Sequence, residues 1–492
     1  MGTGLRYDAA IIGAGADGLA AAATLGRSGL KAVIIERNEH PGGRCMLREF
    51  HPGFRAAPFV DELAPVPPQI AWDLDLARRG AVFIPAPVSS GLWPDRAKMV
   101  RSSELARLSN GLVHQALERA EQDVAPKPRP VPWLGSAREP TPWPGDALAL
   151  RSLEAQVREI IGDETAASVA IAGALCGRAA HPALAGSSLH LLVPGGSGLV
   201  VGGLSKLADA LVSAAQDAGA ELRCGSEVTD IRCSDSKTCG VTLADGTEIE
   251  ARGVISTLDL KRTFLSLFEW NALPKGLANH AATFRMAGST ARLLLALESL
   301  PEPSAFATAN LFRGPIHIAP AADDFAAAYS AWRAGTLAER LPLTLRFVSV
   351  TDPSLAPIGS ATMTVTAGAV PARLFDGAWT HEKREALRQR MLASIEYVLP
   401  GSRAHVLASE LIVPPDIEDA LGLTEGDLWG GEIAADQMLA LRPWLDCAAP
   451  RTPIGGFYLA GPSTTAGVLS TCGAGVLAAQ ALAADLAAGR LK

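Results

Sequence analysis

Apolar positions along the chain predict short buried strands alternating with helices. Residues 8–12 form a nearly continuous apolar run, which is typical of a parallel strand covered on both faces. An alanine-rich helix is expected at 18–28, and a second apolar run follows at 30–35. The chain is therefore expected to open with a strand–helix–strand unit.

The same patterns extend through the rest of the chain. Helices are expected at 67–79, 102–122, 153–176, 204–218, 380–398 and 474–488. Strands are expected at 81–85, 221–223, 228–233, 240–243, 248–251, 254–257, 291–297, 343–350, 361–367 and 457–460. A turn-rich loop is expected at 461–473. Seven prolines at 126–144 exclude helix and central sheet, so this segment is a surface loop or a lid near a pocket.

Three glycines follow the first strand with the spacing G-x-G-x-x-G. Gly13 allows a tight bend, Gly15 lets the backbone approach a pyrophosphate, and Gly18 lets the helix lie close to the strand. The helix N-terminus offers free N–H groups and a positive dipole to phosphates. Glu36 ends the second strand and can accept both hydroxyls of a ribose. This unit predicts a dinucleotide cofactor, with an ordinary α/β glycine turn as the alternative.

A glycine pair at 42–43 precedes Arg44. Adjacent glycines let the backbone pass close to a flat or charged group, and Arg44 can meet a phosphate. A plain β-turn is the alternative interpretation. No Ser/His/Asp or Cys/His constellation is visible, so no catalytic residue is assigned. His181 and His190 are candidates only because they precede a glycine turn at 195–198.

Composition narrows the class of protein. A chain of 492 residues is too long for one core and predicts two domains. The net charge of −7 argues against a nucleic-acid partner. The first residues lack a signal-peptide layout, and no apolar stretch reaches the roughly 18 residues of a membrane span. Seven scattered cysteines predict reduced thiols in a cytoplasmic protein, and no metal-ligand spacing is found.

Six motifs occur together over almost the whole chain. They are the glycine turn with Glu36, "GGR" at 42–44, "PQIAWDLDLARRG", "PGGSGLVVGGLSKLADAL", "LADGTEIEARGVIST" and "GFYLAGPSTTAGVLSTCGAG". In this order the chain resembles the two-dinucleotide-fold flavoproteins related to phytoene desaturase, and most of all the branch of pyridine nucleotide-disulphide oxidoreductase domain-containing proteins. The resemblance implies an α/β fold with a glutathione-reductase-like, FAD-binding Rossmann domain at 1–70, 190–261 and 425–492. A discontinuous, mixed α+β substrate domain is implied at 71–189 and 262–424.

The resemblance also implies which residues bind FAD. Those from the N-terminal part of the chain are Gly13, Gly15, Ala16, Gly18, Glu36, Arg37, Gly43 and Arg44. The glycine turn would line the pyrophosphate, Glu36 would take the adenosine ribose, and Arg44 would approach the flavin side. FAD is expected to be non-covalent, because Cys45 and Cys472 are the only thiols expected near it and neither lies in an attachment motif.

The remaining implied residues are Val228, Gly461, Gly467, Val468 and Leu469. Val228 would pair its backbone with adenine, and Gly461 would begin the loop that meets the pyrophosphate and ribityl chain. Residues 467–469 would lie beside the isoalloxazine ring, and the N-terminus of the following helix would point at the pyrimidine end. There a helix dipole stabilises the negative charge of reduced flavin.

Two departures from the family pattern bear on the substrate. Relatives carry a His-Pro-Gly-Gly-Gly-like run where this chain has Thr465-Ala466-Gly467-Val468-Leu469, and Pro462 stands where many of them place an aspartate. The carotenoid-like substrate of those relatives therefore does not follow. We expect an apolar pocket without converging Arg or Lys, and a compact hydrophobic substrate.

These features favour a flavoenzyme that moves a hydride between a substrate carbon and flavin N5, since this chemistry needs an oriented cofactor and a dry pocket. The electron acceptor is oxygen, a quinone or a nicotinamide. The alternatives are a flavin-dependent isomerase without net redox change, a lipid-binding escort protein on the same fold, and an amine oxidase. The last is disfavoured by the lack of a visible aromatic cage near the C-terminal loop. Peripheral membrane contact is an alternative to a purely cytoplasmic location.

Overall fold

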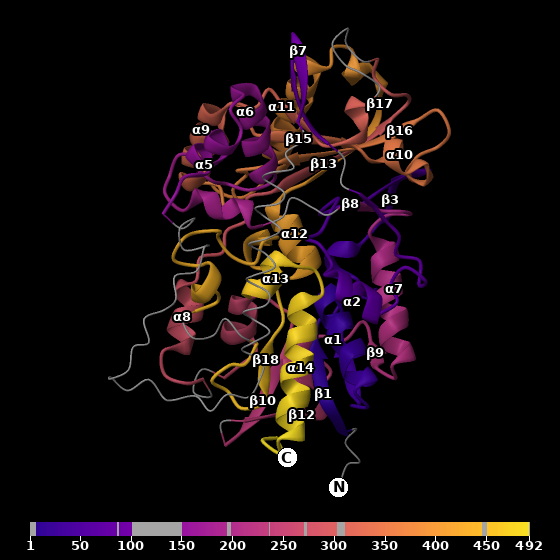
Figure 1. Ribbon diagram of the computed structural model, residues 1–492, viewed down its shortest axis with the longest axis vertical. Coiled ribbons are helices and arrows are strands. Elements are labelled where there is room, and N and C mark those ends of the chain that lie inside the picture. The colour runs from indigo at the N-terminus through magenta and orange to yellow at the C-terminus, as the bar shows by residue number, and fades with distance from the viewer. Residues whose placement is uncertain are drawn as a thin grey trace.

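The computed structural model describes residues 6–85, 88–100, 150–193, 198–235, 237–269, 273–302, 310–444 and 450–491. The helix expected at 102–122, the proline-rich segment 126–144 and most of the glycine turn at 195–198 lie outside these residues. In the view of Figure 1, one sheet lies in the half of the molecule that holds both termini, and a second lies in the opposite half.

The first sheet has the strand order β10-β11-β12-β1-β2-β9, with β18 beside β12. Its strands are β1 (Arg6–Ile12), β2 (Ala32–Ile35), β9 (Glu221–Arg223), β10 (Val228–Ser234), β11 (Lys237–Leu243), β12 (Glu248–Ser256) and β18 (Phe457–Leu459). The strands β18, β12, β1, β2 and β9 pair in parallel, whereas β10, β11 and β12 pair antiparallel. This parallel core brings the carboxyl ends of β1, β2 and β12 to one edge of the sheet.

Three helices cover one face of this sheet: α1 (Ala16–Arg27), α7 (Ser205–Asp217) and α14 (Gly473–Ala487), seen side by side in Figure 1. Their alanines and leucines pack on inward residues of β1 such as Ile11. The opposite face packs on Phe264 and on α8 (Leu277–Thr283). Burial on both faces explains why β1 and β2 read as continuous apolar runs.

The second sheet has the order β17-β13-β16-β15-β14-β6-β7. Its strands are β6 (Ser89–Trp93), β7 (Arg96–Val100), β13 (Ala291–Leu297), β14 (Ile316–Ile318), β15 (Leu343–Phe347), β16 (Ala361–Ala367) and β17 (Val406–Ile412). Helices α9 (Ala322–Arg333) and α11 (His381–Val398) pack on it through Trp332, Leu387 and Met391. A buried ion pair between Arg292 of β13 and Asp61, 2.6 Å long, ties the N-terminal part of the chain to this sheet.

Shorter elements complete the described part. They are β3 (Arg48–His51), β4 (Phe54–Ala56), β5 (Phe83–Pro85), β8 (Gly198–Val200), α2 (Pro68–Asp73), α5 (Leu153–Ile160), α6 (Glu164–Ala174), α10 (Val348–Thr351), α12 (Pro414–Leu421) and α13 (Thr465–Leu469). In Figure 1, α12 and α13 lie at the level between the two sheets. Among the described helices, none is both long and apolar enough to cross a bilayer. The domain boundaries stay a prediction.

Several expected elements differ from the structure. The helix expected at 67–79 ends at Asp73, and 74–80 form turns. The helix expected at 153–176 is divided into α5 and α6, because Asp163 caps a new helix by accepting a 2.7 Å bond from the Ala166 amide. The strands expected at 248–251 and 254–257 form the single strand β12, which pairs with β1 from Glu250 to Ser256 without a break between the two expected strands. The strand expected at 343–350 ends at Phe347 and turns into α10. The loop expected at 461–473 contains α13, capped by the Thr464 hydroxyl.

Candidate functional site

The glycine turn between β1 and α1 is held closed by its own packing. The Gly13 amide donates a 2.8 Å bond to Ile35 O, and its backbone has a φ of +97°. A Cβ at Gly13 would lie 2.3 Å from Thr257 Oγ1, and one at Gly18 would lie 2.0 Å from Gly13 O. A Cβ at Gly15, by contrast, would meet no atom within 4 Å, so this backbone faces open space. The turn thus needs two glycines for packing and presents the third to a ligand.

A cleft with about 800 Å³ of empty space, including its mouth, opens in front of this turn. We call it the glycine cleft. Its walls come from five segments, at 13–17, 36–45, 257–258, 421–423 and the neighbourhood of Pro462 and Thr471, and Leu63 adds a further contact. The expected residues Gly13, Gly15, Ala16, Glu36, Gly43 and Arg44 all line it. The structure therefore brings six of the eight expected N-terminal residues together at the carboxyl edge of the parallel sheet, as such folds place their ligands. Gly18 packs on Gly13 instead of lining the cleft.

Glu36 is buried at the end of β2, where each of its carboxylate oxygens meets one backbone amide. Oε2 accepts from Ala14 N at 2.8 Å and Oε1 accepts from Asn38 N at 3.0 Å. A carboxylate oxygen has two lone-pair sites, so each retains one for a ribose hydroxyl. A dinucleotide fits these residues of the cleft. The exposed backbone at Gly15 and the cationic Arg44 suit its pyrophosphate, and the free lone pairs of Glu36 suit its ribose.

Arg44 also lines the cleft, from the short turn 43–45. Its Nη1 donates a 2.7 Å bond to Leu428 O, and burial lowers the pKa of its guanidinium from the ordinary value while attraction to Asp17 opposes this. Cys45 lines the cleft beside it, and burial raises the pKa of this thiol to about 12. Burial also raises the pKa of Cys472 well above its ordinary value. Both thiols stay protonated at neutral pH and are poor nucleophiles.

Asp17 is a residue of this cleft that the sequence analysis did not single out. It is buried, and its carboxylate accepts a 3.2 Å bond from the Gly475 amide in the first turn of α14. A Cβ at Gly475 would lie 1.9 Å from Asp17 O, so α1 and α14 touch here. Burial raises the pKa of Asp17 to about 7, although the backbone bonds and Arg44 lower it. Asp17 occupies one of the x positions of the G-x-G-x-x-G motif, where the motif specifies no residue type, so the sequence did not indicate a role for it.

Other expected residues lie behind the walls rather than on the cleft. Arg37 donates a 2.7 Å bond to Asp419 O and packs on Gly422, which does line the cleft. Val228 is buried at the start of β10. A Cβ at Gly461 would lie 2.6 Å from Thr257 O, so this glycine lets the C-terminal loop close against the cleft wall.

The expected flavin neighbours 467–469 lie on α13. Gly467 packs tightly on Gly461, since a Cβ there would be 2.2 Å from Gly461 O. Val468 and Leu469 belong to a buried apolar cluster, against which Trp429 and Ile433 also pack. The other buried members of this cluster are Leu189, Leu192, Val193, Met438 and Leu439.

A second cavity, which we call the polar pocket, has about 730 Å³ of empty space including its mouth. It is lined by 178–181, 184–187, His190, Ala287, Ser289, Tyr329, Trp332, Asp427, Trp429 and 431–435. Both candidate histidines, His181 and His190, line it. The lining is less apolar than we expected from the sequence, because Arg178, Asp427 and Glu432 belong to it. Among the described lining residues Arg178 is the single Arg or Lys, so no cluster of cations converges here.

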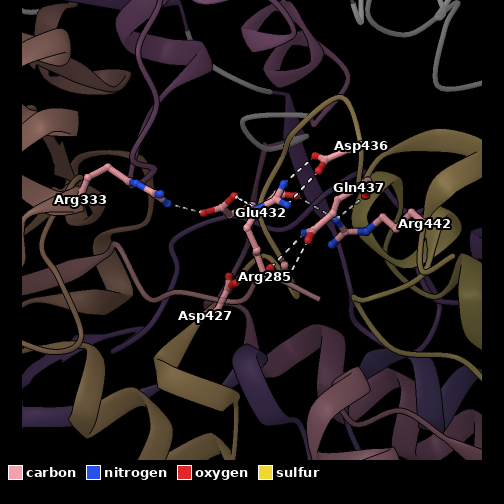
Figure 2. A network of polar contacts seen from close by, with 8 residues as sticks. Arg285, Arg333, Asp427, Glu432, Asp436, Gln437 and Arg442 are labelled. Carbon is pink, nitrogen blue, oxygen red and sulfur yellow. Dashed lines mark hydrogen bonds and ion pairs between the residues drawn. The ribbon is translucent and has the colours of Figure 1, made fainter. Parts of the chain in front are cut away.

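A polar network fixes the 427–442 segment at this pocket (Figure 2). Arg285 donates to Glu432 Oε2 at 2.6 Å and to both carboxylate oxygens of Asp436. Arg333 approaches Glu432 Oε1 from the other side at 3.5 Å. Gln437 exchanges bonds with the Arg285 backbone, accepting at 2.6 Å and donating at 3.0 Å. Both carboxyl oxygens of Glu432 are therefore occupied by arginine.

Arg442 is fully buried and binds backbone carbonyls instead of a carboxylate. It donates to Trp429 O at 2.8 Å, Gly430 O at 2.9 Å and Pro462 O at 3.0 Å, and also contacts the 432–438 stretch. Pro462 lines the glycine cleft and Trp429 lines the polar pocket, so this one side chain joins the two sites.

Asp427 begins the pocket wall. Its Oδ1 accepts from Trp429 N at 2.8 Å and its Oδ2 from Gly431 N at 3.0 Å, which folds the 427–431 turn. Burial raises the pKa of Asp427 to about 6, against the attraction of Arg442. Burial and the nearby Arg178 lower the pKa of His190 well below 6.5, so this imidazole is neutral at pH 7. Asp427, Trp429 and Arg178 carried no motif, and sequence reasoning missed them.

Comparison with known proteins places the chain in a family. Residues 11–75 match the NAD(P)-binding Rossmann-like domain, and residues 151–487 match the flavin containing amine oxidoreductase family. The chain is 26% identical to pyridine nucleotide-disulfide oxidoreductase domain-containing protein 2 of Mus musculus, over 93% of this chain and 90% of that protein. It is also 26% identical to a neurosporene-forming phytoene desaturase of Rhodobacter capsulatus, over 96% and 93%.

A third relative is one component of the limonene dehydrogenase of Castellaniella defragrans, 27% identical over 98% of this chain and 95% of that one. Among solved structures, an oxidoreductase from Methanosarcina mazei aligns with a TM-score of 0.61 at 18% identity, covering 96% of this chain and 99% of that one. A redesigned putrescine oxidase aligns with a TM-score of 0.62 at 16% identity, covering 99% of both chains. These structures show the fold, and the family match covers more than half of the chain. The expected flavoprotein fold and FAD cofactor are confirmed, and the chain belongs to the flavin containing amine oxidoreductase family as an FAD-dependent oxidoreductase.

Proposed function

We propose that this oxidoreductase transfers a hydride between a carbon atom of a compact, largely apolar substrate and flavin N5, with FAD bound non-covalently in the glycine cleft. FAD supplies the hydride acceptor or donor when bound. The protein binds the pyrophosphate at Gly15 and the ribose at Glu36. It also excludes water from the reacting carbon. The protonated, buried Cys45 and Cys472 support the non-covalent link.

One observation carries this proposal: the polar pocket meets the apolar cluster of Val468 and Leu469. Trp429 and Ile433 belong to both, since they line the pocket and pack on the cluster. A substrate in the pocket would therefore face the α13 segment where the flavin ring is proposed to lie. The limonene dehydrogenase and phytoene desaturase relatives act, by their names, on hydrocarbons.

A second candidate, amine oxidation, is suggested by the family's name and by aromatic residues at the pocket. Tyr329, Trp332 and Trp429 line it, which the sequence did not indicate. The face of the Trp429 ring is covered, however, by the Arg178 guanidinium at 4.2 Å. This cation disfavours a second positive charge, so we prefer a substrate oxidised or reduced at carbon without an ammonium group.

The decisive experiment is anaerobic reduction of the purified yellow protein by a panel of lipophilic alkenes, alcohols and amines. We expect alkenes or alcohols, and not amines, to bleach the flavin absorbance. Reduction by amines alone would contradict the proposal. Turnover of an alkene to its isomer by flavin-reduced protein, with no net oxidation, would favour the isomerase instead.

Substrate length tests the role of α13. Replacing the buried Val468 and Leu469 together by alanine removes side chains that would narrow the pocket at the ring. We expect the double variant to accept longer substrates, at a stability cost of about 2–5 kcal/mol for the leucine truncation. The measurement is the rate of anaerobic flavin reduction by a homologous alcohol series. An unchanged length profile in the folded, FAD-loaded variant would contradict the constriction.

A further inference from the structure

The polar pocket contains three buried polar atoms that no described residue satisfies. They are Arg178 Nε, His190 Nδ1 and Trp429 Nε1. Arg178 is 3% exposed and His190 is 4% exposed, so solvent does not reach them freely. Arg Nε–H and Trp Nε1–H are always donors, and a buried donor without an acceptor costs about 1–3 kcal/mol. Donors left unmet beside a cavity indicate a ligand that brings an acceptor.

Among the described residues, the face of the Trp429 ring contacts the charge of Arg178 but no carboxylate pairs with it. Its other guanidinium nitrogens donate only to neutral carbonyls: to Ala174 O at 2.7 Å, His190 O at 3.3 Å and Val193 O at 3.1 Å. Burial lowers the pKa of Arg178 to about 10, so it remains protonated at neutral pH. A buried cation of this kind is costly unless an anion joins it.

The carboxylates of the pocket are committed elsewhere. Asp427 folds its own turn through the amides of Trp429 and Gly431, and Glu432 is held by Arg285 and Arg333. Among the described residues, no carboxylate forms an ion pair or hydrogen bond with Arg178. The described residues therefore leave this negative charge to a ligand.

The rest of the lining describes the body of such a ligand. Leu184, Ala287, Trp332 and Ile433 offer apolar surface beside the donors. The Trp429 ring beneath the guanidinium, 4.2 Å away, holds the plane of Arg178 in one orientation. The site thus combines an oriented cationic fork with apolar walls.

We propose that Arg178 and Trp429 bind the carboxylate of an amphipathic organic acid, whose apolar part extends past Ile433 toward Val468 and Leu469. This inference rests on the proposed function in taking the polar pocket as the substrate site, and it names the substrate class as a hydrophobic carboxylic acid. His190, neutral and with Nδ1 unmet, adds a hydrogen bond to the same head group.

Calorimetric titration of the FAD-loaded protein tests the proposal without turnover. The probes are octanoate, octanamide, 1-octanol and octylamine, which share one chain and differ in the head group. We expect octanoate to bind at least about tenfold more tightly than octanamide or 1-octanol, as a charge-assisted bond of about 1.5–3 kcal/mol implies, and octylamine to bind most weakly. Equal affinities for octanoate and octanamide in the wild type would overturn the proposal.

Two variants locate the effect. Trp429→Phe keeps an aromatic ring beneath Arg178 and removes the Nε1 donor, so octanoate affinity should fall several-fold, about 1 kcal/mol. The affinity for 1-octanol should fall less, because a bond to a neutral oxygen is weaker than a charge-assisted one. The matched control is Trp332→Phe, because Trp332 lines the same pocket but its Nε1 already donates to Gly288 O at 3.0 Å. Trp332→Phe should leave the octanoate-to-octanol ratio unchanged. An equal change in both variants would contradict the assignment.

Arg178→Gln should abolish the preference for octanoate over octanamide. If the Arg178→Gln variant does not fold, the Trp429→Phe measurement tests the proposal. The outcomes separate this inference from the proposed function. Selective binding of octanoate, together with failure of every lipophilic compound to reduce the flavin, would contradict the proposed reaction and leave the acid site standing. Flavin reduction by alcohols with no acid preference would contradict the acid site alone.

Discussion

The glycine cleft and the polar pocket differ in which part of the chain shapes them. The cleft is shaped by backbone: Gly13 and Gly18 leave no room for a side chain, and Gly15 exposes main chain to the ligand. The pocket is shaped by side chains that reach it from separate places, as Arg178, Trp332 and Trp429 do. A backbone site is set by short-range geometry, whereas a side-chain site depends on the whole tertiary fold. The two should therefore respond to mutation in different ways.

The largest expected effect separates packing from binding within the glycine cleft. Gly18→Ala places a Cβ 2.0 Å from Gly13 O and should destabilise the apoprotein by about 1–3 kcal/mol or more, with loss of FAD. Gly15→Ala meets no protein atom within 4 Å, so it should lower FAD retention and leave apoprotein stability near wild type. Denaturant unfolding and flavin absorbance after dialysis measure both. Equal destabilisation by the two alanines would contradict the distinction.

Glu36→Ala should come next. It removes up to two charge-assisted hydrogen bonds to ribose, worth about 1.5–3 kcal/mol each, so FAD should be lost on dialysis. It also leaves the Ala14 and Asn38 amides without their acceptor. Glu36→Gln is the control, because its carbonyl oxygen can still accept one of these bonds. Full flavin retention by Glu36→Ala would exclude the ribose contact.

The pH dependence of FAD binding distinguishes the two sites by their buried acids. Asp17 has a folded pKa of about 7, above its ordinary 3.8, so between about pH 4 and 7 the folded protein holds a proton that the unfolded chain has released. The free energy of unfolding therefore falls as pH rises through this window, and Asp17→Asn should remove that slope.

Ionised Asp17 also repels a pyrophosphate, so the dissociation constant of FAD should rise from pH 6 to pH 8.

Asp427→Asn is the matched control for this measurement. Asp427 has a raised pKa of about 6 but lines the polar pocket and not the glycine cleft. This variant should keep the wild-type dependence of FAD affinity on pH, whereas Asp17→Asn should flatten it. The reverse result would show that the 427–431 turn governs cofactor binding.

The smallest effect is expected in the network of Figure 2. Arg333 is 56% exposed and lies 3.5 Å from Glu432, so Arg333→Gln should change the free energy of unfolding by less than about 0.5 kcal/mol. Arg285→Gln removes closer bonds to Glu432 and Asp436 and should cost up to about 1 kcal/mol. Urea unfolding compares them. A larger loss in the Arg333 variant would mean that the outer pair, and not Arg285, fixes the pocket wall.

The same contrast explains what the sequence could predict. The strand before Gly13, the glycine spacing and Glu36 lie within one local unit, and this unit predicted a dinucleotide cofactor on an α/β fold. The family and FAD followed from six such local motifs in order along the chain. The division of the 153–176 helix had a local signal too, because Asp163 after Gly162 is a good N-cap. Arg178 and Asp427 lie far apart in sequence and meet only through the tertiary fold. No spacing could pair them, so the polar character of the pocket was missed.

The segment from Leu421 to Ala435 has a consequence for engineering. Its first residues, 421–423, form a wall of the glycine cleft, and 427–435 form a wall of the polar pocket. Arg442 then fastens this segment to Pro462 in the C-terminal loop. A pocket transplanted from a relative to change substrate range would thus have to carry 421–442 together with the loop around Pro462 as one cassette. Exchanging 427–435 alone would join foreign residues to the native 421–423 and would disturb the packing of the wall that holds the cofactor.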